Sequence, residues 1–249
     1  MNSPIYIMWL RQLKRTWRSK PRLIGSLAQP LLFLVALGFG FGPIFQKAGE
    51  GNYINFLSPG IIAMTILFSS MFAGMEVLWD KEFGFLKETL VAPVSRWKIM
   101  LGRTLGGATV SSLQGIVVFL LAMAIGFRPT SLPMIFLSFI FMFLIAMLFT
   151  SLGTAIASKL EDMQAFPIII NFIIMPLFFL SGALFPLEGL SKSLSIIIKL
   201  NPLSYGVDAM RQSLTGVIQF SLLFDFGVLF ILTLIIMLIG SRLFNRIEI

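Results

Sequence analysis

Few side chains in this sequence could act as an acid, a base, a nucleophile or a metal ligand. The chain contains no His and no Cys, and only 11 of its 249 residues are Asp or Glu. His is the commonest general base and transition-metal ligand, and Cys supplies thiolate ligands. We therefore predict no catalytic residue, no metal site and no cofactor in this chain, and we disfavour a membrane-embedded enzyme that acts on lipids.

A short charged segment, KEFGFLKETLVAPVSR at 81–96, separates two stretches that are almost free of charge. Asp80 is a suitable N-cap, Glu82 favours the first turn of a helix, and Pro93 would end that helix. The segment therefore predicts a short amphipathic helix. Its apolar face would hold Phe83, Leu86 and Leu90, and its polar face Lys81, Gly84 and Glu88, with Lys87 at the boundary.

A helix with charges of both signs and an apolar ridge suits a groove on another protein better than a surface of anionic lipid. The alternative is a surface helix that only returns the chain to the membrane. The pattern by itself leaves both interpretations open.

The elements around this segment are those of a membrane protein. Hydrophobic residues make up 57% of the chain and charged residues 12%, whereas a soluble domain carries about 25% charged residues. A spanning helix needs roughly 20 mostly apolar residues. We expect an all-α integral membrane fold with six transmembrane helices. Five are continuous, at 24–45, 57–79, 104–126, 133–157 and 222–241. The remaining span, at 165–186, is fifth in chain order and is broken by Pro167, Pro176 and Pro186.

The positive charges predict the orientation. Fourteen of the 19 Lys and Arg residues fall on the side that would hold both termini and the loop 80–103. By the positive-inside rule this side is cytoplasmic, in a multi-pass protein of the inner (plasma) membrane. Because this topology accounts for the net charge of +8, we expect the lipid bilayer as a partner and no nucleic acid. We also expect no cleaved signal peptide, and a single domain over residues 1–249.

Residues 1–22 predict a separate amphipathic helix. Its apolar stripe and its basic face lie on opposite sides of a helical wheel, which is typical of a helix in the membrane interface, with Trp at headgroup depth and basic residues towards anionic lipid. The alternative is a basic flank that only sets the topology. The apolar stripe holds Ile5, Trp9, Leu13 and Trp17, and the basic face Arg11, Lys14, Arg15 and Arg18.

Large polar groups are scarce inside the spans. Glu76 and Asp225 lie near span ends, where we expect them to reach water. Gln114 and Asn171 lie deeper, and we expect Asn171 to hydrogen-bond across helices rather than to contact a substrate. An ion-driven carrier would need carboxylates at mid-depth, and a channel a ring of charge or a carbonyl filter. Neither class is favoured. The Phe- and Met-rich second and fifth spans could instead line a path for a lipophilic substrate.

Three stretches resemble permeases of the ATP-binding-cassette type-2 exporter family, which includes drug-resistance, nodulation-factor and polysaccharide exporters. They are FLSPGIIAM at 56–64, WDKEFGFLKETLVAPVSRWKIMLGR at 79–103, and PLFFLSGALFPLEGLSKSLSIIIKLNPLSYGVDAMRQSL at 176–214. The last one carries the family's Ser-Gly, Phe-Pro, Asn-Pro-Leu-x-Tyr and Asp-x-x-Arg pattern. The matching residues are Ser181, Gly182, Phe185, Pro186, Asn201, Pro202, Leu203, Tyr205, Asp208 and Arg211.

The resemblance implies partners. In the family the short helix after the second span is a coupling helix, which docks in a cleft of an ATPase subunit. The chain has no Gly-x-x-x-x-Gly-Lys-Ser/Thr loop, so ATP and Mg would be bound by that separate subunit. Six spans resemble half a transporter, which implies a homodimer of permeases with two ATPase copies. By position, the docking residues would be Glu82, Phe83, Gly84, Phe85, Leu86, Lys87 and Glu88.

The resemblance also implies an exporter of a lipophilic or amphiphilic molecule, drug-like or lipid-linked; the alternative within the family is export of a polysaccharide or lipid-linked glycan. Residues 187–221 are too hydrophobic for a solvated loop, so we expect re-entrant helices in the outer leaflet, with Asp208 and Arg211 spaced to pair. They would form a structural cap, a gate, or both. The residues of this extracellular cap are Pro186, Asn201, Pro202, Tyr205, Asp208 and Arg211.

Overall fold

A computed structural model describes residues 3–47, 52–186 and 192–245. All regular elements in these ranges are helices. In chain order they are α1 (Pro4–Arg18), α2 (Lys20–Lys47), α3 (Tyr53–Glu82), α4 (Phe85–Val91), α5 (Arg96–Ile125), α6 (Leu132–Lys159), α7 (Ala165–Ile169), the π-helix η1 (Ile170–Ile174), α8 (Met175–Phe179), α9 (Lys192–Leu200), α10 (Pro202–Thr215) and α11 (Leu222–Asn245).

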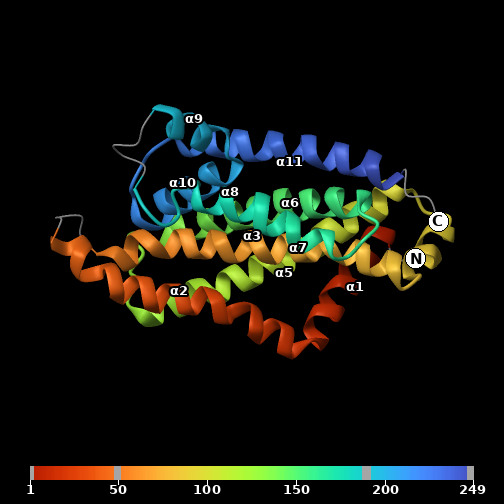
Figure 1. Cartoon of the computed structure of the whole chain (residues 1–249), viewed down its shortest axis with the longest axis horizontal. Coiled ribbons are helices and arrows are strands. Elements are labelled where there is room, and N and C mark those ends of the chain that lie inside the picture. The colour runs from red at the N-terminus through yellow and green to blue at the C-terminus, as the bar shows by residue number, and fades with distance from the viewer. Residues whose placement is uncertain (1–2, 48–51, 187–191, 246–249) are drawn as a thin grey trace.

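Five of these helices, α2, α3, α5, α6 and α11, are long and apolar enough to cross a membrane. They run along the long axis of the molecule, with α1 across one end and α9 and α10 at the other (Figure 1). The predicted all-α membrane fold is confirmed. The chain is a multi-pass membrane protein whose non-spanning helices are divided between the two ends of the bundle.

The segment predicted as a broken span is helical over residues 165–179 only. Its middle, η1, is π-helical, and the Met175 N–H donates to the Ile170 carbonyl five residues back. The wider turn comes directly before Pro176, which has no N–H to donate and whose ring would clash with the carbonyl four residues earlier. The predicted irregularity is therefore present. This segment is shorter than the other five, and a sixth crossing stays a prediction.

The long helices continue beyond the predicted spans, because charged residues lower the hydropathy without ending a helix. α5 begins at Arg96, although the predicted span begins at 104, and α3 extends to Glu82. Asp80 therefore lies inside α3, and its predicted role as an N-cap is wrong. Gly84 separates α3 from α4 instead, with a φ of 77°, a left-handed conformation that suits glycine. α4 ends at Val91, shortly before Pro93 as predicted.

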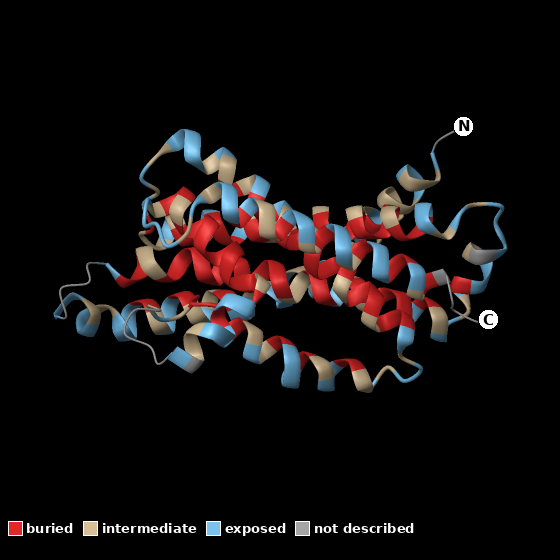
Figure 2. Ribbon diagram, turned by 90° about the horizontal axis from the view of Figure 1, so that it is seen from above, coloured by how far each residue is buried: buried red, intermediate tan, exposed pale blue. Residues whose placement is uncertain are grey.

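α3 lies at the centre of the bundle, and its buried side is continuous along most of its length (Figure 2). It packs against α2, α5, α6 and α10. Its closest approach is to α6, where Gly74 meets the backbone of Gly153. Small residues allow such close crossings in membranes, where dispersion contacts replace the hydrophobic effect as the attraction between helices. α3 and α6 thus form the rigid centre of the fold.

We expect Gly74→Ala to lower the thermal stability of the purified chain, because the added Cβ would overlap with the backbone of Gly153. Overpacking of this kind costs about 1–3 kcal/mol. The unfolding midpoint in detergent measures the effect. The matched control is Gly227→Ala in α11, where a Cβ meets nothing within 4 Å. Equal midpoints for the two variants would contradict the close crossing.

Candidate functional site

Helix α1 packs on the membrane-spanning helix α5. Gly102 and Gly106, one turn apart on α5, lie against the backbone and side chains of α1, with no room for a Cβ. The Trp9 indole N–H donates to Thr109 Oγ1 at 3.1 Å. Trp9 is therefore held against α5, and its place at headgroup depth stays a prediction. Trp17, two turns further along α1, is 77% exposed and fits that prediction.

Asp80 is the centre of a buried ion-pair cluster at this end of the bundle. Its carboxylate accepts hydrogen bonds from Arg15 Nη1 at 3.0 Å and from Arg11 Nη2 at 3.2 Å, both on α1. It also binds Arg103 on α5. The Asp80 side chain is 3% exposed. One carboxylate thus joins α1, α3 and α5 through charge-assisted hydrogen bonds, which are stronger than neutral ones.

Glu76 extends this cluster by one turn of α3. Its carboxylate accepts a hydrogen bond from the buried Gln12 amide and lies 3.8 Å from Arg15 Nη1. Glu76 is 4% exposed, so the expectation that it reaches water is wrong; α1 covers it. Asp225 is also buried instead of hydrated. The i, i+4 spacing of Glu76 and Asp80, facing Arg11 and Arg15 at the same spacing, is the signal that sequence reasoning missed.

The α4 segment is largely exposed on this end of the molecule. Of the predicted docking residues, Glu82, Phe83, Phe85, Lys87 and Glu88 are exposed and Gly84 is half-buried. Leu86 is the exception: it is 2% exposed and packs into the core, so it anchors α4 and is not accessible to a partner. The predicted apolar ridge is therefore divided between the core and the surface.

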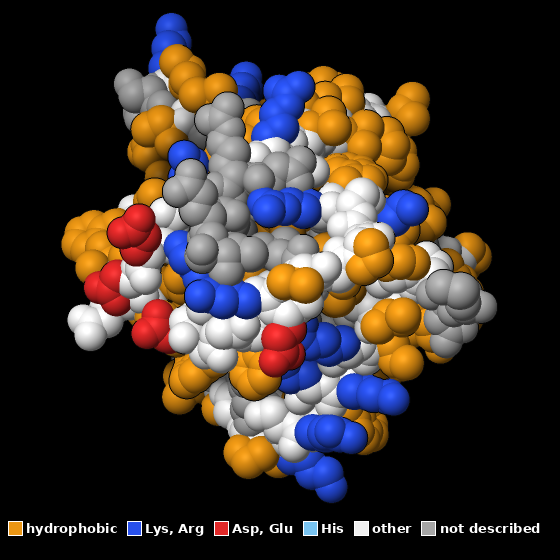
Figure 3. Space-filling view, turned by 90° about the vertical axis from the view of Figure 1, so that its right-hand side faces the viewer, with side chains coloured by type: hydrophobic (Ala, Val, Ile, Leu, Met, Phe, Trp, Pro, Cys, Tyr) orange, Lys and Arg blue, Asp and Glu red, His pale blue; other side chains and the backbone are white. Residues whose placement is uncertain are grey.

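Two grooves flank Phe85, one on each side. The first, of about 530 Å³, lies between α1 and α4 and includes Glu88 and Thr89. The second, of about 700 Å³, lies between α1 and the end of α3 and includes Trp79 and Phe83. Seen from this end, Lys and Arg side chains are spread over much of the face, with the few acidic ones mostly to one side (Figure 3). The exposed Phe85 ring thus stands between two hollows on a mainly basic surface.

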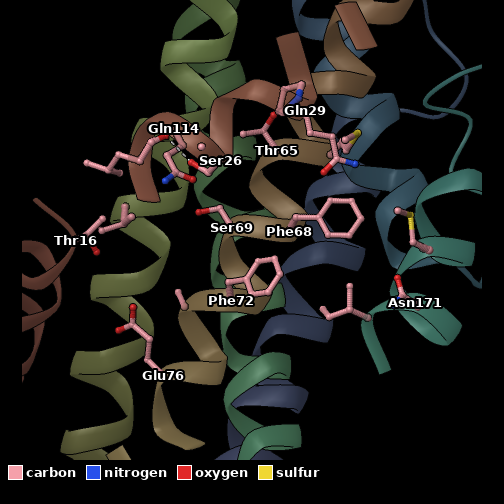
Figure 4. A pocket seen from close by; sticks show the side chains of 18 residues that line it. Thr16, Ser26, Gln29, Thr65, Phe68, Ser69, Phe72, Glu76, Gln114 and Asn171 are labelled. Atoms are coloured by element: carbon pink, nitrogen blue, oxygen red, sulfur yellow. Dashed lines mark hydrogen bonds between the residues drawn. The ribbon is translucent and has the colours of Figure 1, made fainter. Parts of the chain in front are cut away.

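A cavity lies deeper in the bundle. This cavity, of about 480 Å³, is enclosed by α2, α3, α5 and the 165–179 segment, with Glu76 and Thr16 at one end (Figure 4). Hydrogen-bonding and aromatic side chains alternate in its lining. The polar ones are Ser26, Gln29, Thr65, Ser69, Gln114 and Asn171, and the large apolar ones include Met64, Phe68, Phe72 and Met175.

Asn171 lies on η1, is exposed, and lines this cavity. Among the described residues its amide has no hydrogen-bond partner, so the predicted bond across helices is wrong. The buried oxygen Oε1 of Gln114 likewise has no partner in the described part of the chain. An amide group inside a membrane costs free energy unless it is hydrogen-bonded. The cavity therefore offers polar groups that are free to meet a guest molecule.

At the opposite end, α10 is fastened to the end of α8. Asn201 caps α10 by accepting from the Leu203 N–H at 3.0 Å, and its amide donates to the Leu177 carbonyl at 2.6 Å. The Tyr205 hydroxyl donates to the Lys199 carbonyl at 2.6 Å. Pro202 occupies the first turn of α10, where a missing N–H costs nothing. Pro186 is half-buried, and the rest of its loop, 187–191, lies outside the described residues.

Asp208 and Arg211 do not form the predicted ion pair, and no salt bridge joins them in the described structure. Arg211 Nη2 donates to the Gly182 carbonyl at 2.8 Å, and its guanidinium lies 4.0 Å from the centre of the Phe56 ring. Asp208 accepts from the Phe220 N–H at 2.8 Å. Burial raises the pKa of Asp208 and lowers that of Arg211 to about 10, which leaves Arg211 charged at neutral pH. Arg211 thus holds the loop that contains Gly182, and Asp208 holds the loop that contains Phe220.

Comparisons with known proteins decide the family. The model of a family described as ABC-2 type transporter matches residues 4–215. The chain belongs to this family. It is 30% identical to the transport permease ycf38 of Cyanophora paradoxa, over 98% of this chain and 88% of the relative. It is 25% identical to nodulation protein J of Rhizobium leguminosarum bv. viciae, over 90% of this chain and 86% of the relative.

Membership of the ABC-2 family confirms the resemblance found in the sequence. The chain is a transport permease, and permeases of this family normally pair with an ABC ATPase subunit and are generally not catalytic themselves. The family match covers α1, α4 and α10 as well as the spans α2, α3, α5 and α6. The ion-pair cluster, the cavity and the cap all lie largely within it.

We expect Asp80→Asn to destabilise this ABC-2 permease, because three guanidinium groups would lose their shared counter-charge. Removing one partner of a buried ion pair costs about 3 kcal/mol, roughly 5–10 °C in Tm for a chain of this size. Thermal unfolding of the purified chain measures the effect. The control is Glu82→Gln, an exposed acid near the end of the same helix. A Tm as high as that of the control would show that the cluster does not hold α1 in place.

Proposed function

We propose that this ABC-2 permease is the membrane subunit of an ATP-driven exporter, moving a lipophilic or amphiphilic molecule out of the cytoplasm or the inner leaflet. A separate ATPase subunit binds ATP and Mg and supplies the force. Both termini and α4 face the cytoplasm, at the inner (plasma) membrane. The distribution of Lys and Arg supports this orientation.

The observation that carries the proposal is the exposed Phe85 ring between two grooves. An aromatic side chain beside a hollow is the usual anchor of a protein interface. Phe83 and Trp79 extend the apolar area, and Glu82, Lys87 and Glu88 form a charged rim around it. The ATPase subunit is the partner that the family supplies for this face. The buried Leu86 would transmit a push on α4 to the core.

The cavity supports a homodimer with two ATPase copies. Its borders, α2 and the 165–179 segment, both point large apolar side chains outwards, among them Phe39 and Phe172. Asn171 is exposed between them, and an unpaired amide facing lipid tails is costly. A second permease across this face would cover the amide and close the cavity. The two half-cavities would then form one pathway.

The cavity lining supports an amphiphilic cargo. Phe68 and Phe72 offer apolar contact, while Gln29, Ser69 and Asn171 offer hydrogen bonds. Aromatic faces with a few placed polar groups are typical of small-molecule sites. The same lining suits a sugar attached to a lipid, so a polysaccharide or lipid-linked glycan stays the alternative cargo. The α9–α10 cap would act as the outer gate, with Arg211 and Asn201 holding it closed.

We expect Phe85→Ala to weaken binding of the ATPase subunit by about 30-fold, because aromatic anchors of interfaces contribute about 2 kcal/mol or more. Glu82→Arg should uncouple ATP hydrolysis from transport by reversing a rim charge. Co-purification and ATP-dependent transport in vesicles measure the two effects.

The matched control is Phe136→Ala, which removes another exposed ring from α6, outside both grooves. It should leave ATPase binding unchanged. The docking role would be refuted if Phe85→Ala and Phe136→Ala retained the ATPase subunit equally well. Transport by the purified permease without any nucleotide-hydrolysing partner would refute the ATP-driven mechanism itself.

A further inference from the structure

A third groove lies where α1 turns into α2, on the side of α5. It has a volume of about 570 Å³, and its walls are almost entirely apolar. The α5 wall holds Val110, Leu113 and Val117, one side chain per helical turn, with Gln114 beside them. The remaining apolar wall residues are Leu13, Leu23 and Leu27.

The mouth of this groove is basic. Lys14 and Arg18 line it from the last turns of α1, with Trp17 between them. The cations of α1 thus divide into two sets. Arg11 and Arg15 bind Asp80, whereas Lys14 and Arg18, which also line the groove beside Trp79, are exposed and form no ion pair with any described residue. Two uncompensated cations therefore border an apolar hollow.

The level of the groove in the membrane follows from the chain around it. α1 ends at Ser19, and α2 then begins its course through the bilayer. Trp17 is 77% exposed at this turn, and exposed Trp side chains favour the headgroup region. The wall from Val110 to Val117 covers about 10 Å of helix, against roughly 15 Å for the hydrocarbon of one leaflet. The cations thus lie at headgroup depth and the apolar walls at acyl-chain depth.

We propose that this groove binds one anionic glycerophospholipid of the leaflet next to α1. Its phosphate lies between Lys14 and Arg18, and an acyl chain lies along Leu113 and Val117. Charge complementarity selects this occupant over a zwitterionic lipid, and a hollow of this size is not left empty beside fluid hydrocarbon. The lipid would fix the angle between α1 and α2, next to the cavity of the proposed pathway. Binding needs neither ATP nor the ATPase subunit.

The test is native mass spectrometry of the full-length chain, titrated with phosphatidylglycerol or with phosphatidylcholine of the same acyl chains. We expect one retained phosphatidylglycerol, with about tenfold preference or more. Each basic residue near a charged surface contributes about fivefold, so Lys14→Gln with Arg18→Gln should lower retention by 10- to 30-fold. The matched control is Lys98→Gln with Lys159→Gln, two exposed cations that do not line the groove.

A second pair of variants tests the acyl-chain site. Leu113→Trp should fill the groove and weaken both lipids, whereas Ile231→Trp, at an exposed position of α11, should not. Equal losses in the two charge variants would overturn the proposal in favour of diffuse attraction. Unchanged lipid retention by the Leu113→Trp variant would also overturn the proposal. A change in the oligomeric mass of that variant would overturn it as well, because it would assign the groove to a second copy of the chain. The measurement involves no transport, so its failure would leave the exporter function standing.

Discussion

The fold of the basic end depends on the buried carboxylate of Asp80. Asp80 joins Arg11 and Arg15 of α1 to Arg103 of α5, and Glu76 adds a second carboxylate 3.8 Å from Arg15. A carboxylate that is 3% exposed is costly by itself, and so is a buried guanidinium, so each group requires the other. α1 is therefore part of the bundle and not a helix floating on the membrane. Because α4 begins five residues after Asp80, a force on α4 reaches α1, α3 and α5 together.

This arrangement gives the permease one side of closely packed helices and another side whose helices are interrupted. α3 and α6 cross through Gly74 and Gly153 with backbones in contact, a geometry that leaves little room to slide. The cavity wall opposite them is interrupted at several points. α2 contains Pro30 and Pro43, the 165–179 segment has a π-helical turn before Pro176, and α1 breaks from α2 at Ser19. Such interruptions are where helices bend.

Composition predicted the membrane fold and five of the spans. Hydropathy is summed over many residues, so a single misjudged residue changes the prediction of a span very little. It could not place the helix ends, since Lys, Arg and Glu continue a helix after it leaves the lipid, as at the start of α5. Asp80 was assigned to a cap because Asp before an amphipathic run is a local signal; its true partners lie 65 or more residues earlier on α1, or on α5. The prediction for Asn171 fails for a different reason: it lies on the π-helical turn η1 at the edge of the cavity, where no described residue meets its amide.

The division of the α1 cations into paired and unpaired ones connects these features. Arg11 and Arg15 are committed to Asp80, so they cannot also hold the headgroups that the sequence pattern suggested for them. Only Lys14 and Arg18 remain for that task, and they lie in the last turns of α1, before the break that leads into α2. The paired cations thus hold α1 on the bundle, and the unpaired ones border the groove near the start of α2. Under the proposed function, a push on α4 would carry α1 along with α3 through Asp80, and the break after Arg18 would let α2 tilt separately.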